Sequence, residues 1–411
     1  MRHARGAALA TDVMSSNERL DSWKEIAAYL KRGVRTVQRW EHVAGLPVRR
    51  IATARGAVYA FRGEIDAWWR TQSIAPATST PAPPLPPASD PPVPRVQTPD
   101  ASPAAATTAS MRVRPFVSHT LGIDPDSAPT QANLAVYFFT LVAMGMLRPT
   151  EGMPAARAAA QRALDLDPAN TDAHVVSALV ASLYEHDWAG ATQQLEVVLR
   201  RDRVSPSARF HYATWHLSPL GRHAEAQHQL TLALADDPLY LLGRVQYALE
   251  LQSLGRSDEG LAELEAVWKI DPRFGPALGL AGREYALRGR VADALSFAER
   301  TYAAAPRHAN AVGFLAGMLR RTGSQARADE VLATLDADSA WVRARARAEA
   351  HVVCMEFDGA IEALSEASAA RDPGVWLVIA GTTGNIIRSM SGWPALCARL
   401  GMDGFAHRTV E

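Results

Sequence analysis

The sequence has few of the features that mark secreted, membrane-spanning or metal-binding proteins. Cys354 and Cys397 are the two cysteines among 411 residues, too few for a disulfide framework or a thiolate metal site. The most apolar run, residues 134–147, is shorter than the about 20 residues that a spanning helix needs. The N-terminus lacks the sustained apolar stretch of a secretory signal. A cytoplasmic protein without a membrane partner is therefore favoured, with residues 134–147 in a buried helix and a membrane anchor as the alternative.

The sequence also lacks a constellation that would place a nucleophile, a base and a metal together. His211 and His216 are five residues apart, as are His223 and His228, whereas two ligands on one helical face are usually four apart. These histidines therefore indicate helix surfaces or grooves better than a metal site. We expect no enzymatic activity, no metal and no cofactor.

The net charge is zero, but the charges are distributed unevenly along the chain. Residues 19–72 contain eleven basic and five acidic side chains, which gives this segment a charge of +6. Residues 1–18 are balanced, so everything after residue 72 has a charge of −6. A short basic segment on an acidic body is typical of a nucleic-acid-binding head on a larger partner domain.

Proline separates these two parts. Eleven of the residues from 76 to 103 are prolines, mixed with alanine, serine and threonine. Such a composition forms neither a hydrogen-bonded ladder nor a packed core, and it favours an extended spacer. We interpret residues 73–125 as a disordered Pro-rich linker and residues 1–18 as a disordered N-terminal extension.

The body contains a repeat of about 34 residues. Gly221, Gly255, Gly289 and Gly323 are each 34 residues apart. A small residue recurs at spacings of 35, 35, 34, 34, 34 and 32 residues, at Ala156, Ala191, Ala226, Gly260, Ala294, Ala328 and Ala360. This period predicts about seven units over residues 126–373, with residues 374–411 forming a capping helix and tail.

Each unit has the pattern of two amphipathic helices. Apolar residues recur at intervals of three and four, as at Leu261, Leu264 and Val267. We expect the repeated glycine to adopt a left-handed backbone that ends the first helix, and the Asp-Pro step to end the second. The small marker residue should let the two helices of a pair approach closely.

These features resemble the tetratricopeptide repeat family, most clearly at Gly282 and Tyr285 and at the terminal Asp-Pro of LDLDP, ALADDP and KIDP. The resemblance implies an α-solenoid whose inner surface binds a protein or peptide partner. The candidate groove residues that it implies are His211, Trp215, Arg244, Arg283, Asn310 and Arg320. The unit ending RRDRVSP lacks its closing proline in phase and the last unit is shifted by two residues, so both should pack irregularly.

The basic segment, residues 19–72, predicts a small separate domain. Asp21 or Ser22 can cap a helix whose buried face holds Trp23, Ile26, Ala27 and Leu30. A second helix should begin near Arg35, after Gly33, with Val34, Val37 and Trp40 facing inward. The alternating segments 48–51 and 58–61 predict a hairpin, and residues 64–70 a last helix with Ile65 and Trp68 or Trp69 in the core.

This segment resembles the winged helix-turn-helix heads of the MerR and excisionase kind, in the version fused to tetratricopeptide repeats in bacterial regulators. The phrases that carry the resemblance are RTVQRWE (35–41), GLP (45–47) and VYAFRGEIDAW (58–68). One departure is that Lys31 and Arg32 stand where such heads usually have the turn glycine. The turn is then remodelled, or the two charges add a phosphate contact.

The resemblance implies that the head binds double-stranded DNA. Arg35, Thr36, Gln38 and Arg39 would contact base edges or phosphates, and Arg49, Arg50 and Arg55 on the hairpin would contact phosphates, with Lys31 and Arg32 beside them. The sequence thus predicts a mainly α protein that acts as a transcriptional regulator, whose repeats bind a protein or form a homodimer. The alternative is a repeat scaffold or adaptor without physiological DNA binding.

Overall fold

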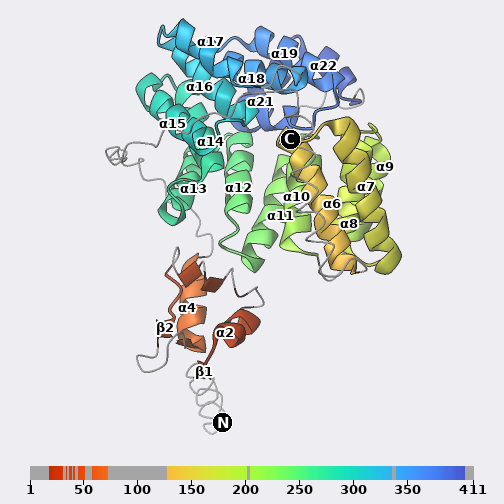
Figure 1. Cartoon of the computed structure of the whole chain (residues 1–411), viewed down its shortest axis with the longest axis vertical. Coiled ribbons are helices and arrows are strands. Elements are labelled where there is room, and N and C mark those ends of the chain that lie inside the picture. Colours follow the sequence, from red (N-terminus) through yellow and green to blue (C-terminus); the bar gives the residue numbers. More distant parts are fainter. Residues whose placement is uncertain are drawn as a thin grey trace, which may run out of the picture.

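The computed structural model describes residues 18–30, 34, 37–38, 40–41, 45–50, 58–72, 127–200, 204–335 and 339–402. Within these ranges the chain is mainly helical and has two parts, a small head and a long helical array (Figure 1). The predicted extension at residues 1–17 and the linker at residues 73–125 lie outside the described residues.

The array is a succession of antiparallel helix pairs that share one continuous hydrophobic core. Its helices are α6 (Ala128–Ala143), α7 (Pro149–Leu166), α8 (Thr171–Leu183), α9 (Trp188–Leu199), α10 (Pro206–Tyr212) continued by η1 (Ala213–Leu217), α11 (His223–Asp236), α12 (Leu241–Ser253), α13 (Ser257–Ile270), α14 (Gly275–Leu287), α15 (Val291–Ala304), α16 (Ala309–Arg321), α17 (Gln325–Ala333), α18 (Ala340–Val353) and α19 (Phe357–Ala369). Three short helices follow: α20 (Val375–Val378), α21 (Gly381–Ser389) and α22 (Trp393–Arg399).

The repeated glycines end the first helix of their pairs as the sequence predicted. Gly221, Gly255, Gly289 and Gly323 have φ angles of 74°, 77°, 76° and 83°, in the left-handed region that favours glycine. After α12, the backbone N–H of Arg256 donates to the Leu251 carbonyl at 2.8 Å. The second helices α13 and α15 end just before Asp271-Pro272 and Ala305-Pro306.

The small marker residues lie where paired helices approach each other most closely. A Cβ added at Gly260 on α13 would lie 2.7 Å from the backbone oxygen of Ala248 on α12. The alanine markers, among them Ala226 and Ala294, are fully buried. A larger side chain would therefore push the helices apart, which confirms the role predicted for these positions.

The sequence predicted irregular packing for the unit that ends in RRDRVSP, and the structure has an irregularity in the helix that follows this phrase, where α10 continues into the π-helix η1. The Ser218 N–H donates to the Ala213 carbonyl five residues earlier, at 2.9 Å, as in a π turn. Residues 201–203, in the phrase RRDRVSP, lie outside the described residues.

The apolar run at residues 134–147 belongs to α6 and the turn that follows it. Leu134 and Phe139 are buried against the neighbouring repeats, which confirms the buried-helix interpretation. Among the residues that the structure describes, no helix has both the length and the apolar character needed to cross a bilayer.

The head contains β1 (Arg19–Leu20), α2 (Trp23–Tyr29), β2 (Arg49–Arg50), β3 (Val58–Phe61) and α4 (Arg62–Gln72). β3 is the central strand of a three-stranded antiparallel sheet in the order β1-β3-β2, with Arg49 opposite Tyr59. The pairing of β2 with β3 corresponds to the predicted hairpin, whereas the pairing of β1 was not predicted. Ser22 caps α2 by accepting a hydrogen bond from the Glu25 N–H at 3.1 Å.

Aromatic and aliphatic side chains of β1, β3, the helices and the segment around Leu46 form the core of the head. Ile26, Trp40 and Ile65 are buried, and the Trp40 ring lies 5.9 Å from that of Trp68 and 5.5 Å from that of Trp69. Val37 and Trp40 are helical and buried as predicted. The prediction for Val34 was wrong: 37% of this residue is exposed, and it is not part of the core cluster of the head.

Within the described residues, the head contacts the array through Leu239 and Ile270. Leu239, in the turn between α11 and α12, is buried in the same cluster as the core of the head, and Ile270 at the end of α13 packs against it. In Figure 1 the head accordingly lies beside the ends of α12 and α13.

Candidate functional site

The residues predicted to line the groove lie on the first helices of successive pairs, where three of them are part of one surface. Trp215 on η1 and Arg283 on α14 are almost completely buried. Asn310 on α16 donates to Glu349 Oε2 at 3.2 Å, and Glu349 also pairs with Arg283 at 3.5 Å. Trp215, Arg283 and Asn310 thus lie along the inner face of the array.

The other three predicted groove residues have partners inside the array or at its rim. Arg244 pairs with Glu263 at 3.1 Å and donates to the Pro238 carbonyl. Arg320 pairs with Glu356 at 3.0 Å. His211 packs against the rings of Phe139 and Phe210, and burial lowers its pKa. These three residues stabilise contacts between helices, and the structure does not bring them to the inner surface formed by Trp215 and Arg283.

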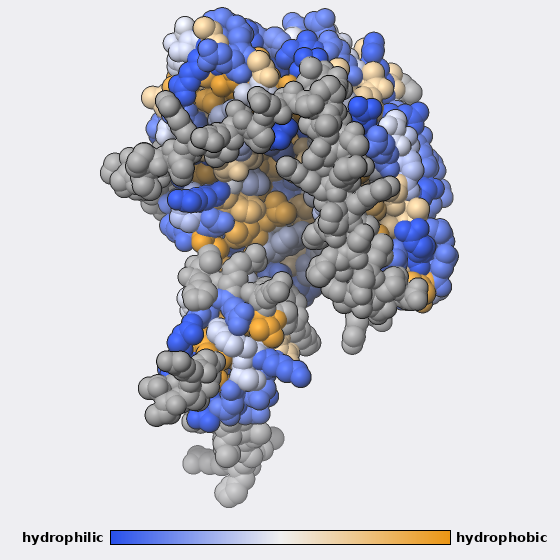
Figure 2. All heavy atoms as spheres, viewed as in Figure 1, coloured by the Kyte–Doolittle hydropathy of each residue, from blue (hydrophilic) through white to orange (hydrophobic). Residues whose placement is uncertain are grey.

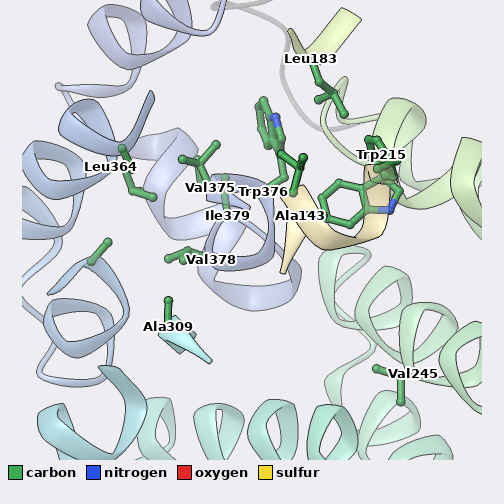
Figure 3. Close-up of a cluster of buried hydrophobic side chains, with 14 of the residues drawn as sticks. Ala143, Leu183, Trp215, Val245, Ala309, Leu364, Val375, Trp376, Val378 and Ile379 are labelled. Carbon is green, nitrogen blue, oxygen red and sulfur yellow. The ribbon is translucent and has the colours of Figure 1, made fainter. Parts of the chain in front are cut away.

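The inner face is covered by the chain's own C-terminal segment, residues 374–402, which we call the tail. The sequence predicted a capping helix here, but α20 packs on α18 and α21 packs on α12, far back along the array. Figure 3 shows Val375, Trp376, Val378 and Ile379 among side chains of early and late repeats, with Trp215 on one side and Leu364 on the other.

The burial of α12 shows that this helix is covered on two sides. Ten of its thirteen residues are buried, whereas five of the fourteen residues of its partner α13 are. A helix with only one packed face buries a single stripe. The cavity left between Trp376 of the tail and array residues such as Trp215 and Gln246 is about 10 Å³, barely room for one water. The tail therefore fills the groove.

In Figure 2 hydrophilic residues cover most of the visible array, and hydrophobic ones gather toward its middle.

Arg283 holds the tail by its main chain. Its Nη1 donates to the Leu377 carbonyl at 3.1 Å and its Nη2 donates to the Ala380 carbonyl at 3.2 Å. Leu377 belongs to the last turn of α20, where helical hydrogen bonding stops and oxygen atoms need other donors, and Ala380 immediately precedes α21. Burial raises the pKa of Glu349, and the Arg283 guanidinium opposes that rise. Arg283 is thus placed by Glu349 to bind peptide carbonyls.

Polar side chains of the tail also bind the array. Thr382 Oγ1 donates to Glu284 Oε2 at 2.8 Å, and the Asn385 side chain donates to the Ser253 carbonyl at 2.7 Å. Arg388 donates to the Ser218 and Pro219 carbonyls at 3.1 Å, and burial lowers its pKa to about 10. These bonds join the tail to three different repeats.

The two ends of the array meet through buried polar contacts. The fully buried Arg345 on α18 pairs with Asp372 at 3.2 Å and donates to the Ala143 carbonyl at the end of α6, at 2.9 Å. Trp188 at the start of α9 donates from Nε1 to the Leu400 carbonyl at 3.0 Å. The first and last repeats are therefore joined.

Several buried polar residues of the inner helices were missed by sequence reasoning. His223 lies 2.8 Å from Glu250, and Gln246 donates to the other oxygen of the same carboxylate at 2.5 Å. Arg345 and Asp372 were missed as well. In the sequence, charged residues on the inner side of the first helices cannot be distinguished from an ordinary solvent-exposed face. The one signal in the sequence was the apolar run WLVIAG after Pro373, which indicates a segment that needs to be buried.

Three of the predicted DNA-contact residues lie within the described part of the head. Arg49 and Arg50 form β2, with 45% and 58% of their side chains exposed. Arg49 pairs with Glu64 at 2.5 Å and lies over the Phe61 ring, and Arg50 pairs with Glu41 at 2.7 Å. Gln38 is half-buried on its helix. The remaining predicted contacts lie outside the described residues: Lys31, Arg32, Arg35, Thr36, Arg39 and Arg55.

Within the ranges that the structure describes, no group of three or more histidine, cysteine or carboxylate side chains is arranged to hold a metal. Cys397 is buried and free, and Cys354 is half-buried and free, with its Sγ directed at the Gly317 carbonyl.

Solved structures similar to this chain are helical-repeat proteins. The type IV pilus biogenesis factor PilW is 21% identical and matches 50% of this chain and 91% of its own, with a TM-score of 0.40. YrrB, a TPR protein with an unusual peptide-binding site, is 22% identical over 48% of this chain and 95% of its own, with a TM-score of 0.32. A tetratricopeptide repeat protein from Parabacteroides merdae is 12% identical over 60% of this chain and 98% of its own, with a TM-score of 0.38.

No family model matches this chain, and no curated protein does. The similarities to solved structures are low, so the helix pairs of the chain itself define its fold. Their 34-residue period, left-handed turn glycines and small contact residues make the array an α-solenoid of repeated helix pairs.

Proposed function

We propose that this protein is a non-catalytic adaptor that binds a protein segment in the inner groove of its repeat array. One observation carries the proposal: the inner face holds a peptide segment, the tail, through bonds from Arg283 to main-chain carbonyls. Recognition of main chain does not depend on the side chains of the bound segment. A groove that binds its own chain in this way has the donors to bind another.

Selection of displayed peptides on the immobilised full chain tests this function. We expect a family of related peptides to be enriched, and enrichment to be lost on the Arg283→Met variant, which keeps the length of the side chain and removes its donors. Enrichment no greater than on a blank surface would overturn the adaptor function. If the peptides bind the Arg283→Met variant and the original chain equally tightly, the binding site lies elsewhere. One such place is the open groove of about 520 Å³ lined by Glu299, Leu315 and Arg327.

A second function, DNA binding by the head, is favoured by the exposed arginines of β2. Arg49 and Arg50 are adjacent, and the segment around them has a charge of +6. Arg49 pairs with Glu64 in an exposed ion pair, which is weak enough for a phosphate to replace, and Arg50 keeps 58% of its side chain exposed beside Glu41. We propose that the head acts as a winged helix-turn-helix domain on double-stranded DNA, and that the protein regulates transcription in the cytoplasm of a bacterium.

Binding of the full chain to short duplexes of random sequence, measured by fluorescence anisotropy at several salt concentrations, tests DNA binding. We expect Arg49→Ala with Arg50→Ala to weaken binding and to lower the slope of log affinity against log salt by about 1 to 2. The matched control is Arg256→Ala with Arg290→Ala, which removes two exposed arginines that also form ion pairs, here with Glu259 and Asp293 on the array. Equal loss in both variants, or no binding even at low salt, would overturn this assignment.

Two copies of the head would bind more tightly than one, because a single small domain makes few contacts. We therefore propose a homodimer formed through the array. Light scattering after size exclusion should give twice the chain mass of 44.4 kDa. A strict monomer with and without DNA would contradict the dimer and leave the adaptor function untouched.

A further inference from the structure

The tail does not extend the solenoid. Its helices have four, nine and seven residues, shorter than the thirteen or fourteen residues of most repeat helices, and they cross the inner face instead of stacking on α19 alone. Residues 373–387 contain no charged side chain. An uncharged segment thus lies on helices that contribute Arg283, Glu284 and Gln252.

The groove fits this segment through two features besides the Arg283 bonds. The Trp376 ring lies 6.2 Å from the Trp188 ring of the array, and the tail's own Arg388 guanidinium lies over Trp376 at 5.8 Å. Gly381 has a φ of 62°, and a Cβ at this position would lie 2.7 Å from Gln252 Oε1 and 3.0 Å from a methyl group of Leu249. The groove therefore accepts a tryptophan, a short apolar turn and a glycine in that order.

The tail is joined to the array by the polypeptide itself, so it competes with any external peptide at an effective concentration in the millimolar range. Release of the tail alone would break the bonds that Arg283 and Glu284 make to it and expose the apolar side chains between tail and groove to water, which is unfavourable. An external segment can replace the tail only if it supplies carbonyls and apolar side chains in the same places.

We propose that the tail is a resident ligand that keeps the groove shut, and that the external partner of the groove is an uncharged, tryptophan-containing peptide that displaces it. This inference rests on the proposed adaptor function. The partner segment has the chemistry of Val375–Gly381: apolar residues around a tryptophan, followed by a glycine.

Weakening the tail in the full chain tests the proposal. Gly381→Val places a β-branched residue at positive φ and against Gln252, so it should loosen the tail and spare the groove. The probe is a labelled synthetic peptide of residues 373–390 with a solubilising tag. We expect it to bind Gly381→Val at least about tenfold more tightly than the original chain, because the internal competitor is weakened.

Two variants serve as controls. Gly255→Val imposes the same backbone strain at a φ of 77°, where a Cβ would meet nothing within 4 Å, so it should leave the affinity for the peptide unchanged. Adding Arg283→Met to Gly381→Val should reduce the gained affinity at least about tenfold, because the donors to the peptide carbonyls are lost. Hydrogen exchange of the tail amides shows which variants have loosened it, and Trp376→Ala provides a second way to loosen it.

The results separate this proposal from the adaptor function. If the tail is released but the peptide binds no more tightly, the resident-ligand proposal is overturned, and peptides selected on the full chain would still support an adaptor that binds elsewhere. If the tail amides stay protected in both Gly381→Val and Trp376→Ala, the tail is a fixed part of the fold and the proposal is overturned as well. If neither selected peptides nor the tail peptide bind any variant, both proposals fail.

Discussion

The head and the array differ in how they are held together. The array joins all its helix pairs through one continuous core and carries buried ion pairs such as Arg345 with Asp372. The head has a small core around Trp40, and its ion pairs, such as Arg50 with Glu41, have exposed arginines. A small domain buries a smaller fraction of its surface, so the head depends on a few large side chains, whereas the array can accommodate buried charges.

The largest effect that we expect is at the contact that closes the array. Arg345→Ala removes one partner of a fully buried ion pair and leaves the Asp372 carboxylate and the Ala143 carbonyl without their donor. We expect the free energy of unfolding to fall by about 3 to 5 kcal/mol, measured by urea denaturation. Arg347→Ala, two residues along the same helix, removes an exposed pair with Glu366 and should change it by no more than about 1 kcal/mol.

A second variant tests whether the head depends on its aromatic core. Trp40→Ala should destabilise the head by about 3 to 5 kcal/mol, because the ring is buried against Trp68 and Trp69. A loss of this size is comparable to the whole stability of a small domain. Hydrogen exchange should show the head amides unprotected while α14 to α16 keep their protection. Loss of protection in these helices would show that the contact at Leu239 couples the two parts.

A third comparison separates sequence preference from general affinity for DNA. Arg35→Ala with Arg39→Ala should abolish the preference for particular duplexes, because each lost base contact costs about 1 to 3 kcal/mol of discrimination. Arg49→Ala with Arg50→Ala should instead weaken binding to all sequences equally. Selection from random duplexes by the full-length variants distinguishes these outcomes, and the same selected sequences for both pairs would contradict the assignment.

The smallest effect that we expect concerns acid. Burial lowers the pKa of His216 to about 3, with a further contribution from Arg222, whereas an unfolded histidine has a pKa near 6.5. The unfolded chain therefore binds a proton at this residue first, so the stability due to neutral His216 is present above pH 6.5 and is lost as the pH falls toward 3. At pH 5 the loss amounts to about 2 kcal/mol.

The matched measurement compares His216→Gln with the original chain. The unfolding free energy of His216→Gln should depend less steeply on pH between about 6.5 and 4 than that of the original chain. The substitution also changes packing, which shifts the free energy at every pH but not its slope. Buried carboxylates such as Asp372 also titrate in this range, so only the difference between the two chains reports on His216. The exposed His228→Gln variant gives the reference for removing a histidine at the surface. Parallel curves for His216→Gln and the original chain would refute the prediction.

Sequence reasoning predicted the repeating parts of the molecule because their causes are local. The left-handed glycines such as Gly255, the Asp-Pro ends and the small contact residues such as Gly260 each depend on neighbours within one unit. It predicted the groove only in part. Trp215, Arg283 and Asn310 lie on the inner face, whereas Arg244 and Arg320 have carboxylate partners within the array. Sequence spacing predicts the helical face on which a residue lies, but the side chain with which that residue pairs depends on which helices pack together.

What the sequence determined by itself is therefore the repeating unit: its length, its two helices and the turns between them, all set by steric and hydrogen-bonding rules within about 34 residues. The place of the tail was decided only by tertiary structure. Trp188 and Leu400 are 212 residues apart, and Arg345 and Ala143 are 202 apart, yet each pair shares a hydrogen bond. Such contacts have no period, because they arise only once the solenoid has curved far enough for its ends to meet around the segment inside it.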